Sequence, residues 1–130
     1  MSKSSNKKLR LAQILMWLAA ISAFLAGIDA VTGLAGTADS MAVVEVWRII
    51  GLWTFAALFA FLAYNPRSSR ILWVIVIGNK LALSIVGFFL MGNSVVVGAS
   101  DLAFFDGGLT ILLFVASLLA DVWHTERSQR

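Results

Sequence analysis

Five ionisable residues lie within or beside long apolar stretches of this chain, and their side chains are the ones most able to do chemistry. They are two cations and three carboxylates: Lys80, Arg48, Asp29, Glu45 and Asp106. A charged group inside a membrane is costly, so it pairs with an opposite charge, faces a water-filled cavity or loses its charge. The residue types therefore predict a polar cluster that either binds an ion or proton, or holds helices in register through ion pairs. The sequence leaves the choice between these two roles open.

Lys80 is the deepest of these charges, near the middle of the apolar stretch Ile71–Met91. A helical rise of about 1.5 Å per residue places its backbone about 14 Å from the basic end of the helix. The same count gives about 21 Å for Asp106, about 24 Å for Arg48 and about 27 Å for Asp29. A lysine stem can extend toward polar surroundings. We expect Asp106 to be the partner of Lys80, with Arg48 and Asp29 or Glu45 completing the network.

The composition places these residues in a membrane protein. Of the 130 residues, 60% are hydrophobic and 13% are charged, whereas soluble domains have about 25% charged residues. Four apolar stretches approach the roughly 20 residues that span a bilayer core. Helices satisfy their backbone polar groups internally within lipid. The predicted fold class is therefore all-α, a four-transmembrane-helix bundle forming one domain over residues 1–130, with helices at about 11–34, 46–64, 71–91 and 102–123.

The basic residues predict the orientation of this bundle. Eight of the ten lysines and arginines fall on one side: Lys3, Lys7, Lys8, Arg10, Arg67, Arg70, Arg127 and Arg130. The positive-inside rule therefore places both termini in the cytoplasm, in a multi-pass protein of the bacterial cytoplasmic membrane. Interfacial aromatic residues fall near the same boundary: Trp17, Tyr64, Trp73 and Trp123. The first apolar stretch is longer than the apolar region of a signal peptide, so we expect it to be retained as a helix.

Small and polar residues recur at helical spacing beside the charges, which predicts that these faces point inward. The first helix carries Ala19, Ser22, Ala26 and Asp29. The third carries Lys80, Ser84 and Gly87, and the fourth carries Asp106, Thr110, Leu113 and Ser117. We therefore expect a polar bundle interior lined by three helices, with the larger apolar residues facing lipid.

The sequence offers little support for an enzyme. It contains no cysteine and a single histidine, His124, which argues against thiolate and histidine-rich metal sites. No G-x-S-x-G, H-E-x-x-H, Walker or G-x-G-x-x-G motif occurs. We therefore expect no catalytic residue, no cofactor and no metal. The basic run at the N-terminus suits anionic lipid headgroups better than nucleic acid, which we do not expect as a partner.

The segment from Trp47 to Phe89 reads WRIIGLWTFAALFAFLAYNPRSSRILWVIVIGNKLALSIVGFF. It resembles the small DoxX-like or BphX-like bacterial membrane proteins. The shared features are a four-helix layout, an Arg-Gly start to the second helix region, a short basic loop and a tryptophan-led third helix. The resemblance implies a fold, and it implies no activity and no functional residue. Small multidrug exporters and small fluoride channels match the chain in architecture only.

Two functions follow from these features. The first is a small accessory or interaction protein of the cytoplasmic membrane, stabilised by a buried ion-pair network. The alternative is a small transporter, or an ion- or proton-coupled binding protein, that uses the polar cluster. The expected partners are the lipid bilayer and either further copies of the chain or a larger membrane complex.

Overall fold

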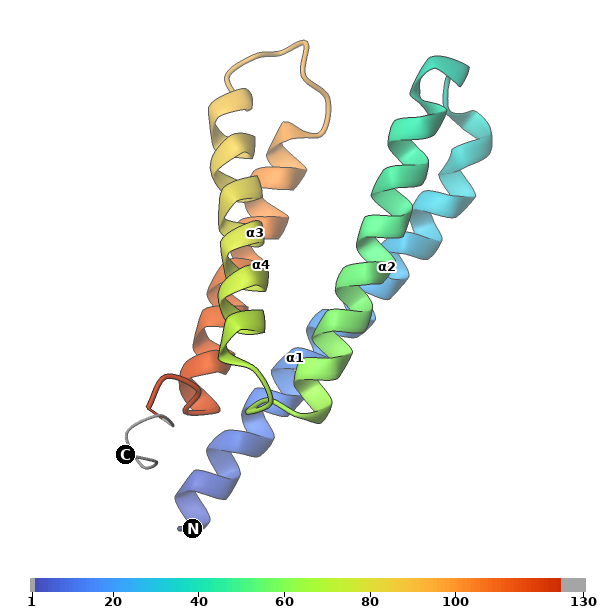
Figure 1. The fold of residues 1–130 in the computed structure, drawn as a ribbon. Coiled ribbons are helices and arrows are strands. Elements are labelled where there is room, and N and C mark those ends of the chain that lie inside the picture. Colours follow the sequence, from blue (N-terminus) through green and yellow to red (C-terminus); the bar gives the residue numbers. More distant parts are fainter. Residues whose placement is uncertain (1, 125–130) are drawn as a thin grey trace.

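The computed structural model describes residues 2–124, and four long α-helices make up most of that range (Figure 1). Each of the four is long and apolar enough to cross a membrane, as the sequence predicts. Two short 3-10 helices, η1 and η2, connect the first pair. In chain order the elements are α1 (Lys3–Gly33), η1 (Leu34–Gly36), η2 (Asp39–Met41), α2 (Ala42–Tyr64), α3 (Arg70–Leu90) and α4 (Ala99–Leu119).

Local sequence signals explain where these helices begin and end. The hydroxyl of Ser69 caps α3 by accepting the Leu72 amide at 3.2 Å, which satisfies one of the free donors of the first turn. The Asn65-Pro66 pair ends α2, because the residue before a proline avoids the helical region. Gly98, with φ of 83°, supplies the left-handed turn that precedes α4.

The observed bounds differ from the predicted ones by three residues or more at four helix ends. Helix α1 begins at Lys3 rather than Leu11, because its basic residues are good helix formers and the Ser2 hydroxyl accepts the Ser5 amide. Helix α2 begins at Ala42, four residues before the apolar run. Helix α4 runs from Ala99 to Leu119 instead of Leu102 to Trp123, and Asp121 just beyond it adopts φ of 57°. Aspartate tolerates this left-handed conformation, and a right-handed helix cannot continue through it.

The helices form two antiparallel hairpins, α1 with α2 and α3 with α4, and contacts between α1 and α4 join the hairpins. Figure 1 shows that the hairpins meet at the end where α1 begins and α4 ends, and that they diverge toward the other end. We call the first the proximal end and the second the distal end. The loop between α2 and α3 is proximal, and the other two connections are distal. Arg127 and Arg130, which were part of the orientation prediction, lie outside the described residues.

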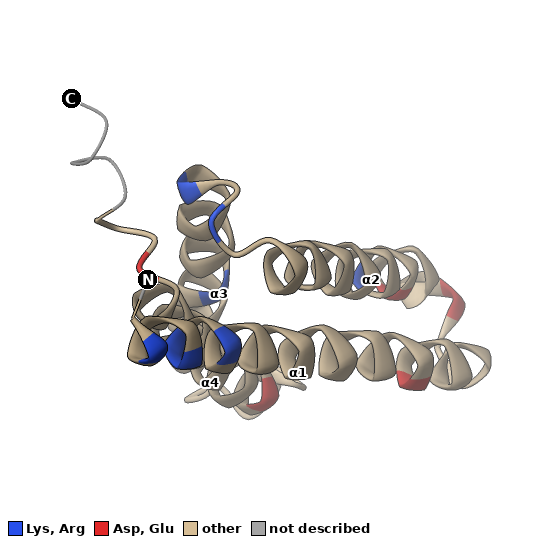
Figure 2. Cartoon of the chain, turned by 90° about the horizontal axis from the view of Figure 1, so that it is seen from below, with Lys and Arg blue, Asp and Glu red and all other residues tan. Residues whose placement is uncertain are grey.

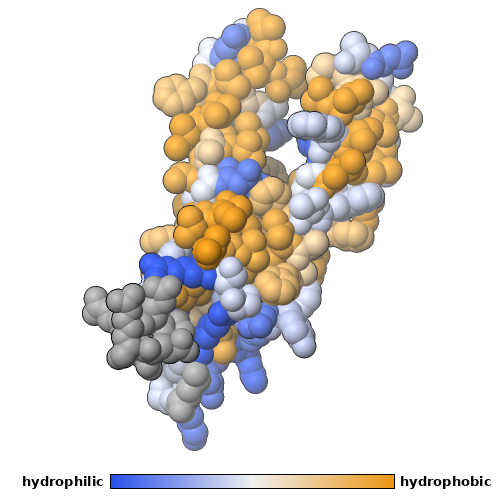
Figure 3. Space-filling model, in the orientation of Figure 1, coloured by the Kyte–Doolittle hydropathy of each residue, from blue (hydrophilic) through white to orange (hydrophobic). Residues whose placement is uncertain are grey.

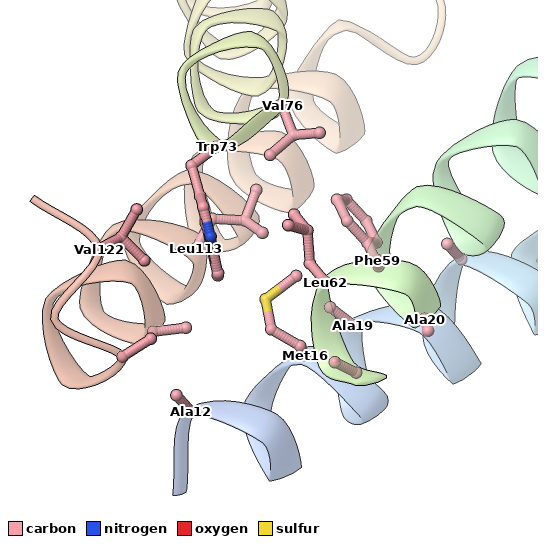
Figure 4. Packing of buried hydrophobic residues seen from close by; sticks show 14 of the residues in the cluster. Ala12, Met16, Ala19, Ala20, Phe59, Leu62, Trp73, Val76, Leu113 and Val122 are labelled. Atoms are coloured by element: carbon pink, nitrogen blue, oxygen red, sulfur yellow. The ribbon is translucent and has the colours of Figure 1, made fainter. Parts of the chain in front are cut away.

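The main hydrophobic core is the junction between the hairpins (Figure 4). Side chains from all four helices converge there, and the largest of them are fully buried: Met16, Phe59, Leu62, Trp73, Val76 and Leu113. The expectation that Trp73 belongs to an interfacial belt was wrong, because its ring is 0% exposed. Its indole N–H donates to the Pro66 carbonyl at 2.8 Å, which gives the buried donor a partner.

The helix faces that are buried in the junction core become exposed toward the distal end. On α2, Leu62 and Phe59 are fully buried and Phe55 is half-buried. Arg48 lies two helical turns farther toward the distal end on the same side, and its side chain is 55% exposed. On α4, Leu109 and Leu112 are half-buried against the junction core, whereas Phe105, one turn before Leu109 on that side, is 72% exposed. The four helices are therefore packed together only in the proximal half.

The predicted inward faces are observed on two helices and not on the third. Lys80, Ser84 and Gly87 are buried on α3. Asp106, Leu113 and Ser117 are buried on α4, and Thr110 is half-buried. On α1 only Ala19 is buried, whereas Ser22, Ala26 and Asp29 are exposed. The prediction for α1 was wrong because α1 leaves the α3–α4 hairpin beyond the junction.

Close packing between α3 and α4 depends on the absence of a side chain at position 87. A Cβ atom there would lie 2.5 Å from the Ala103 backbone nitrogen and 2.9 Å from the Ala99 carbonyl oxygen. We expect Gly87→Ala to force the helices apart and to lower the free energy of unfolding by about 1–3 kcal/mol, the usual cost of overpacking. Thermal unfolding in detergent, followed by circular dichroism, measures this change.

Gly78→Ala is the matched control for that experiment. It lies on the same helix, and an added Cβ would have no neighbour within 4 Å. Alanine favours the helix over glycine, so this variant should melt at the wild-type temperature or above it. Equal losses in the two variants would contradict the close approach at Gly87.

Candidate functional site

Lys80 of α3 and Asp106 of α4 form a buried ion pair, as expected from their depths. The Lys80 Nζ and the Asp106 Oδ1 are 2.9 Å apart, and the two side chains are only 8% and 11% exposed. Burial removes water from both charges, so each group depends on the other for compensation. The pair therefore links the two helices of one hairpin within their long apolar stretches.

Phe55 of α2 covers the pair from the other hairpin. The Lys80 Nζ lies 4.3 Å from the centroid of the Phe55 ring, a distance at which the ring face attracts a cation. Phe55 also contacts the Phe59 ring, with centroids 5.7 Å apart, and Phe59 belongs to the junction core. The ammonium is thus enclosed by a carboxylate from α4 and an aromatic ring from α2.

The helix contact around the pair is close and its polar groups are satisfied. The Ser84 hydroxyl, one turn after Lys80, donates to the Ala103 carbonyl of α4 at 2.8 Å. A Cβ at Gly107 would lie 2.9 Å from that same hydroxyl oxygen. Within the described residues, every buried side-chain nitrogen and oxygen has a hydrogen-bond partner. The site is a closed contact between two helices rather than an open polar chamber.

Arg48 and Glu45 pair with each other and not with Lys80 and Asp106. The Arg48 Nη2 and the Glu45 Oε2 are 2.8 Å apart, one helical turn along α2. A second bond runs from the Arg48 Nε to the same oxygen at 3.0 Å. The side chains are 55% and 23% exposed, so solvent or headgroups weaken the attraction between them. The expected extension of the network to Arg48 was therefore wrong, because a nearer carboxylate satisfies its charge.

Asp29 is also separate from the buried pair. It lies exposed near the distal end of α1 and makes no ion pair within the described residues. Figure 2 shows acidic residues near the distal ends of α1 and α2, and lysine and arginine in the N-terminal turns of α1. The five predicted residues thus divide into a buried pair, an exposed pair and a single exposed carboxylate.

Phe55 contributes to the site, but the search for charged residues in the sequence did not identify it. Its sequence signal is its spacing, since it lies seven residues after Arg48 and four before Phe59 on one face of α2. An aromatic residue on that face, at the depth of Lys80, is a candidate cover for an ammonium. Polar residue types alone do not reveal such a contact.

The arrangement favours holding a charge over moving one. The Lys80 amine donates to a carboxylate and faces an aromatic ring, so two sides of it are occupied.

Among the described residues, no group of three or more histidine, aspartate or glutamate side chains is placed to bind a metal ion. No protein-family model, no curated protein and no solved structure matches the chain.

Replacing one member of the pair should cost more than replacing both. Lys80→Met leaves the Asp106 carboxylate buried without a counter-charge, and we expect a loss of about 3–5 kcal/mol in the free energy of unfolding. Asp106→Asn should cost a similar amount by stranding the ammonium. The double variant removes both charges and should regain most of the loss. Denaturation of all four proteins in detergent gives the coupling energy as a double-mutant cycle.

A matched cycle at Arg48→Met and Glu45→Gln controls for the general effect of removing charge. That pair is exposed, so its coupling should be below about 1 kcal/mol. Additive losses at Lys80 and Asp106 would contradict the interaction between them.

Proposed function

We propose that this protein is a small accessory or interaction protein of the bacterial cytoplasmic membrane, with the proximal end in the cytoplasm. The observation that carries the proposal is the contrast between a closed polar site and an open distal half. The ion pair is enclosed within its own hairpin and under Phe55. Among the described residues, no other helix covers the helix faces that continue outward from the junction core.

The uncovered faces support a transmembrane helix of another membrane protein as the partner. They are continuous with the junction core, in which helices already pack on the same sides of α2 and α4. Figure 3 shows the two arms standing apart above the junction, with hydrophilic residues at the gap on the α1–α2 arm and apolar residues over much of the visible face of both arms. Polar groups on such a face bind other helices because lipid offers them no partner.

The Arg48–Glu45 pair supports the same proposal. It lies in the distal half of α2, on the side that faces the gap, and a large part of its surface is uncovered. A partner helix with one polar side chain at this level would complete the hydrogen bonds of the guanidinium. The pair would then give selectivity to a contact that is otherwise apolar.

The alternative function, an ion-coupled transporter, has less support from the geometry. Such a site needs a route by which water or an ion reaches Lys80. The side chains of the pair are 8% and 11% exposed, and Phe55 occupies the side toward the other hairpin. The resemblance of Trp47–Phe89 to DoxX-like or BphX-like proteins stays a prediction, and it bears on the fold more than on the activity.

Site-specific photo-crosslinking in native membranes tests the proposed function. A photoreactive residue at Leu52, on the gap side of α2, should join the chain to one protein. The same residue at Ile75, which is 56% exposed on α3, is the control for random encounters. The isolated transmembrane segment of the captured protein, expressed with this chain, should retain the crosslink at Leu52. Crosslinks to lipid alone, or equal crosslinking at both positions, would overturn the proposal.

A further inference from the structure

A groove runs between α1 and α2 on the side away from the other hairpin. Its volume is about 500 Å³, and no residue of α3 or α4 lines it. The walls are large side chains: Trp17, Ile21 and Phe24 from α1, and Trp53 from α2. No charged residue lines it. An occupant must therefore be apolar along the length of this groove.

Small residues form the floor of the groove. The lining alanines are Ala20 of α1 and Ala56, Ala57 and Ala60 of α2. Trp53 closes the distal end, where its ring lies directly over Gly27, and a Cβ at Gly27 would overlap the indole nitrogen. The groove is thus built by packing within the α1–α2 hairpin.

The groove is short and open along its length. Its α1 wall runs from Trp17 to Phe24, about 10 Å at 1.5 Å per residue. A lipid acyl chain lying along it meets apolar side chains and no charged group.

The α1 wall of the groove continues into basic residues at its proximal end. The residues of this wall belong to a series along α1 with alternating spacings of four and three residues, so the whole series lies on one helix face. Its members are Lys3, Lys7, Arg10, Ile14, Trp17, Ile21 and Phe24. Lys3, Lys7 and Arg10 are exposed, and no described carboxylate pairs with them. Figure 2 shows these cations in the first turns of α1.

The α2 wall ends in a polar group at the same level. Its series is Trp53, Ala57, Ala60 and Tyr64, and Tyr64 is 80% exposed. The Gln13 amide donates to the Ala63 carbonyl at 3.1 Å, so Tyr64 lies beside the turn of α1 that follows Arg10. Arg10 of α1 and Tyr64 of α2 therefore lie at the proximal ends of the two series that contain the groove walls, and Lys7 lies one turn beyond Arg10.

We propose that this groove binds one anionic phospholipid from the leaflet at the proximal end. Its acyl chain lies along the alanine floor between Trp17 and Trp53. Its phosphate group lies at the mouth, where Arg10 and Lys7 supply charge-assisted hydrogen bonds and Tyr64 supplies a hydroxyl donor. Charge complementarity at the mouth selects an anionic headgroup over a zwitterionic one. The site does not depend on the proposed partner, because it lies on the opposite side of the hairpin from the gap.

Lipid retention measures this site directly. The full chain is reconstituted in phosphatidylcholine bilayers that contain a minor fraction of phosphatidylglycerol, then extracted into mild detergent. Native mass spectrometry counts the lipids that stay bound. The wild type should retain one phosphatidylglycerol in preference to phosphatidylcholine. Lys7→Gln with Arg10→Gln should lower that preference about 25-fold, about fivefold for each basic side chain on the helix face that meets the bound headgroup.

Two matched controls locate the binding. Lys8→Gln removes the same charge from the same helix but off the series, and it should leave the preference unchanged. Ala57→Leu fills the groove from an exposed position and should reduce retention of both lipids, whereas Ala82→Leu, at an exposed alanine of α3, should not. Phosphatidylglycerol with short acyl chains should be retained less by the wild type, which tests the apolar contact without a substitution.

Three results would overturn the proposal. Equal effects of Lys8→Gln and the Lys7 and Arg10 changes would mean that only net charge matters. Full retention in a folded Ala57→Leu variant, together with equal retention of short-chain and long-chain lipid, would exclude the groove. A second copy of the chain bound in place of lipid would make this face a protein interface instead.

Discussion

The Lys80 ammonium lies where water does not solvate it, so the Asp106 carboxylate must stay against it. This requirement sets the register of α3 against α4, because a slip of either helix would bury two separate charges. Gly87 and Gly107 let the helix backbones approach closely enough for the side chains to meet at 2.9 Å. Phe55 then closes the site from α2. One ion pair thus ties the geometry of a hairpin to its contact with the other hairpin.

The two halves of the molecule differ in what holds them. Proximally, Met16, Phe59, Leu62, Trp73 and Leu113 interlock from all four helices. Distally, each hairpin has only its own two helices. In lipid, apolar surface alone does not drive helices together, so packing and polar contacts decide where they meet. The distal faces therefore remain available to a partner helix, while the opposite side of α1 and α2 forms a groove suited to lipid.

The sequence predicted the number of helices, their order and the Lys80 contact, because hydrophobic length and charge depth report directly on these features. It did not predict the separation of the hairpins. Depth along a helix says nothing about how far apart two helices lie, so Arg48 and Asp29 seemed able to reach Lys80. Arg48 instead has Glu45 one turn away. Phe55 was missed because an aromatic residue in an apolar stretch resembles any lipid-facing residue.

The separation of the hairpins at the distal end is the central claim, and an electron-resonance distance measurement in bilayers tests it most directly. The chain contains no cysteine, so spin labels can be placed in pairs. One pair joins Val43 of α2 to Phe89 of α3 distally, and the other joins Phe61 of α2 to Leu118 of α4 proximally. All four positions are exposed. We expect the distal distance to be clearly the longer one. Equal distances at the two ends would indicate a closed four-helix bundle and would contradict the account.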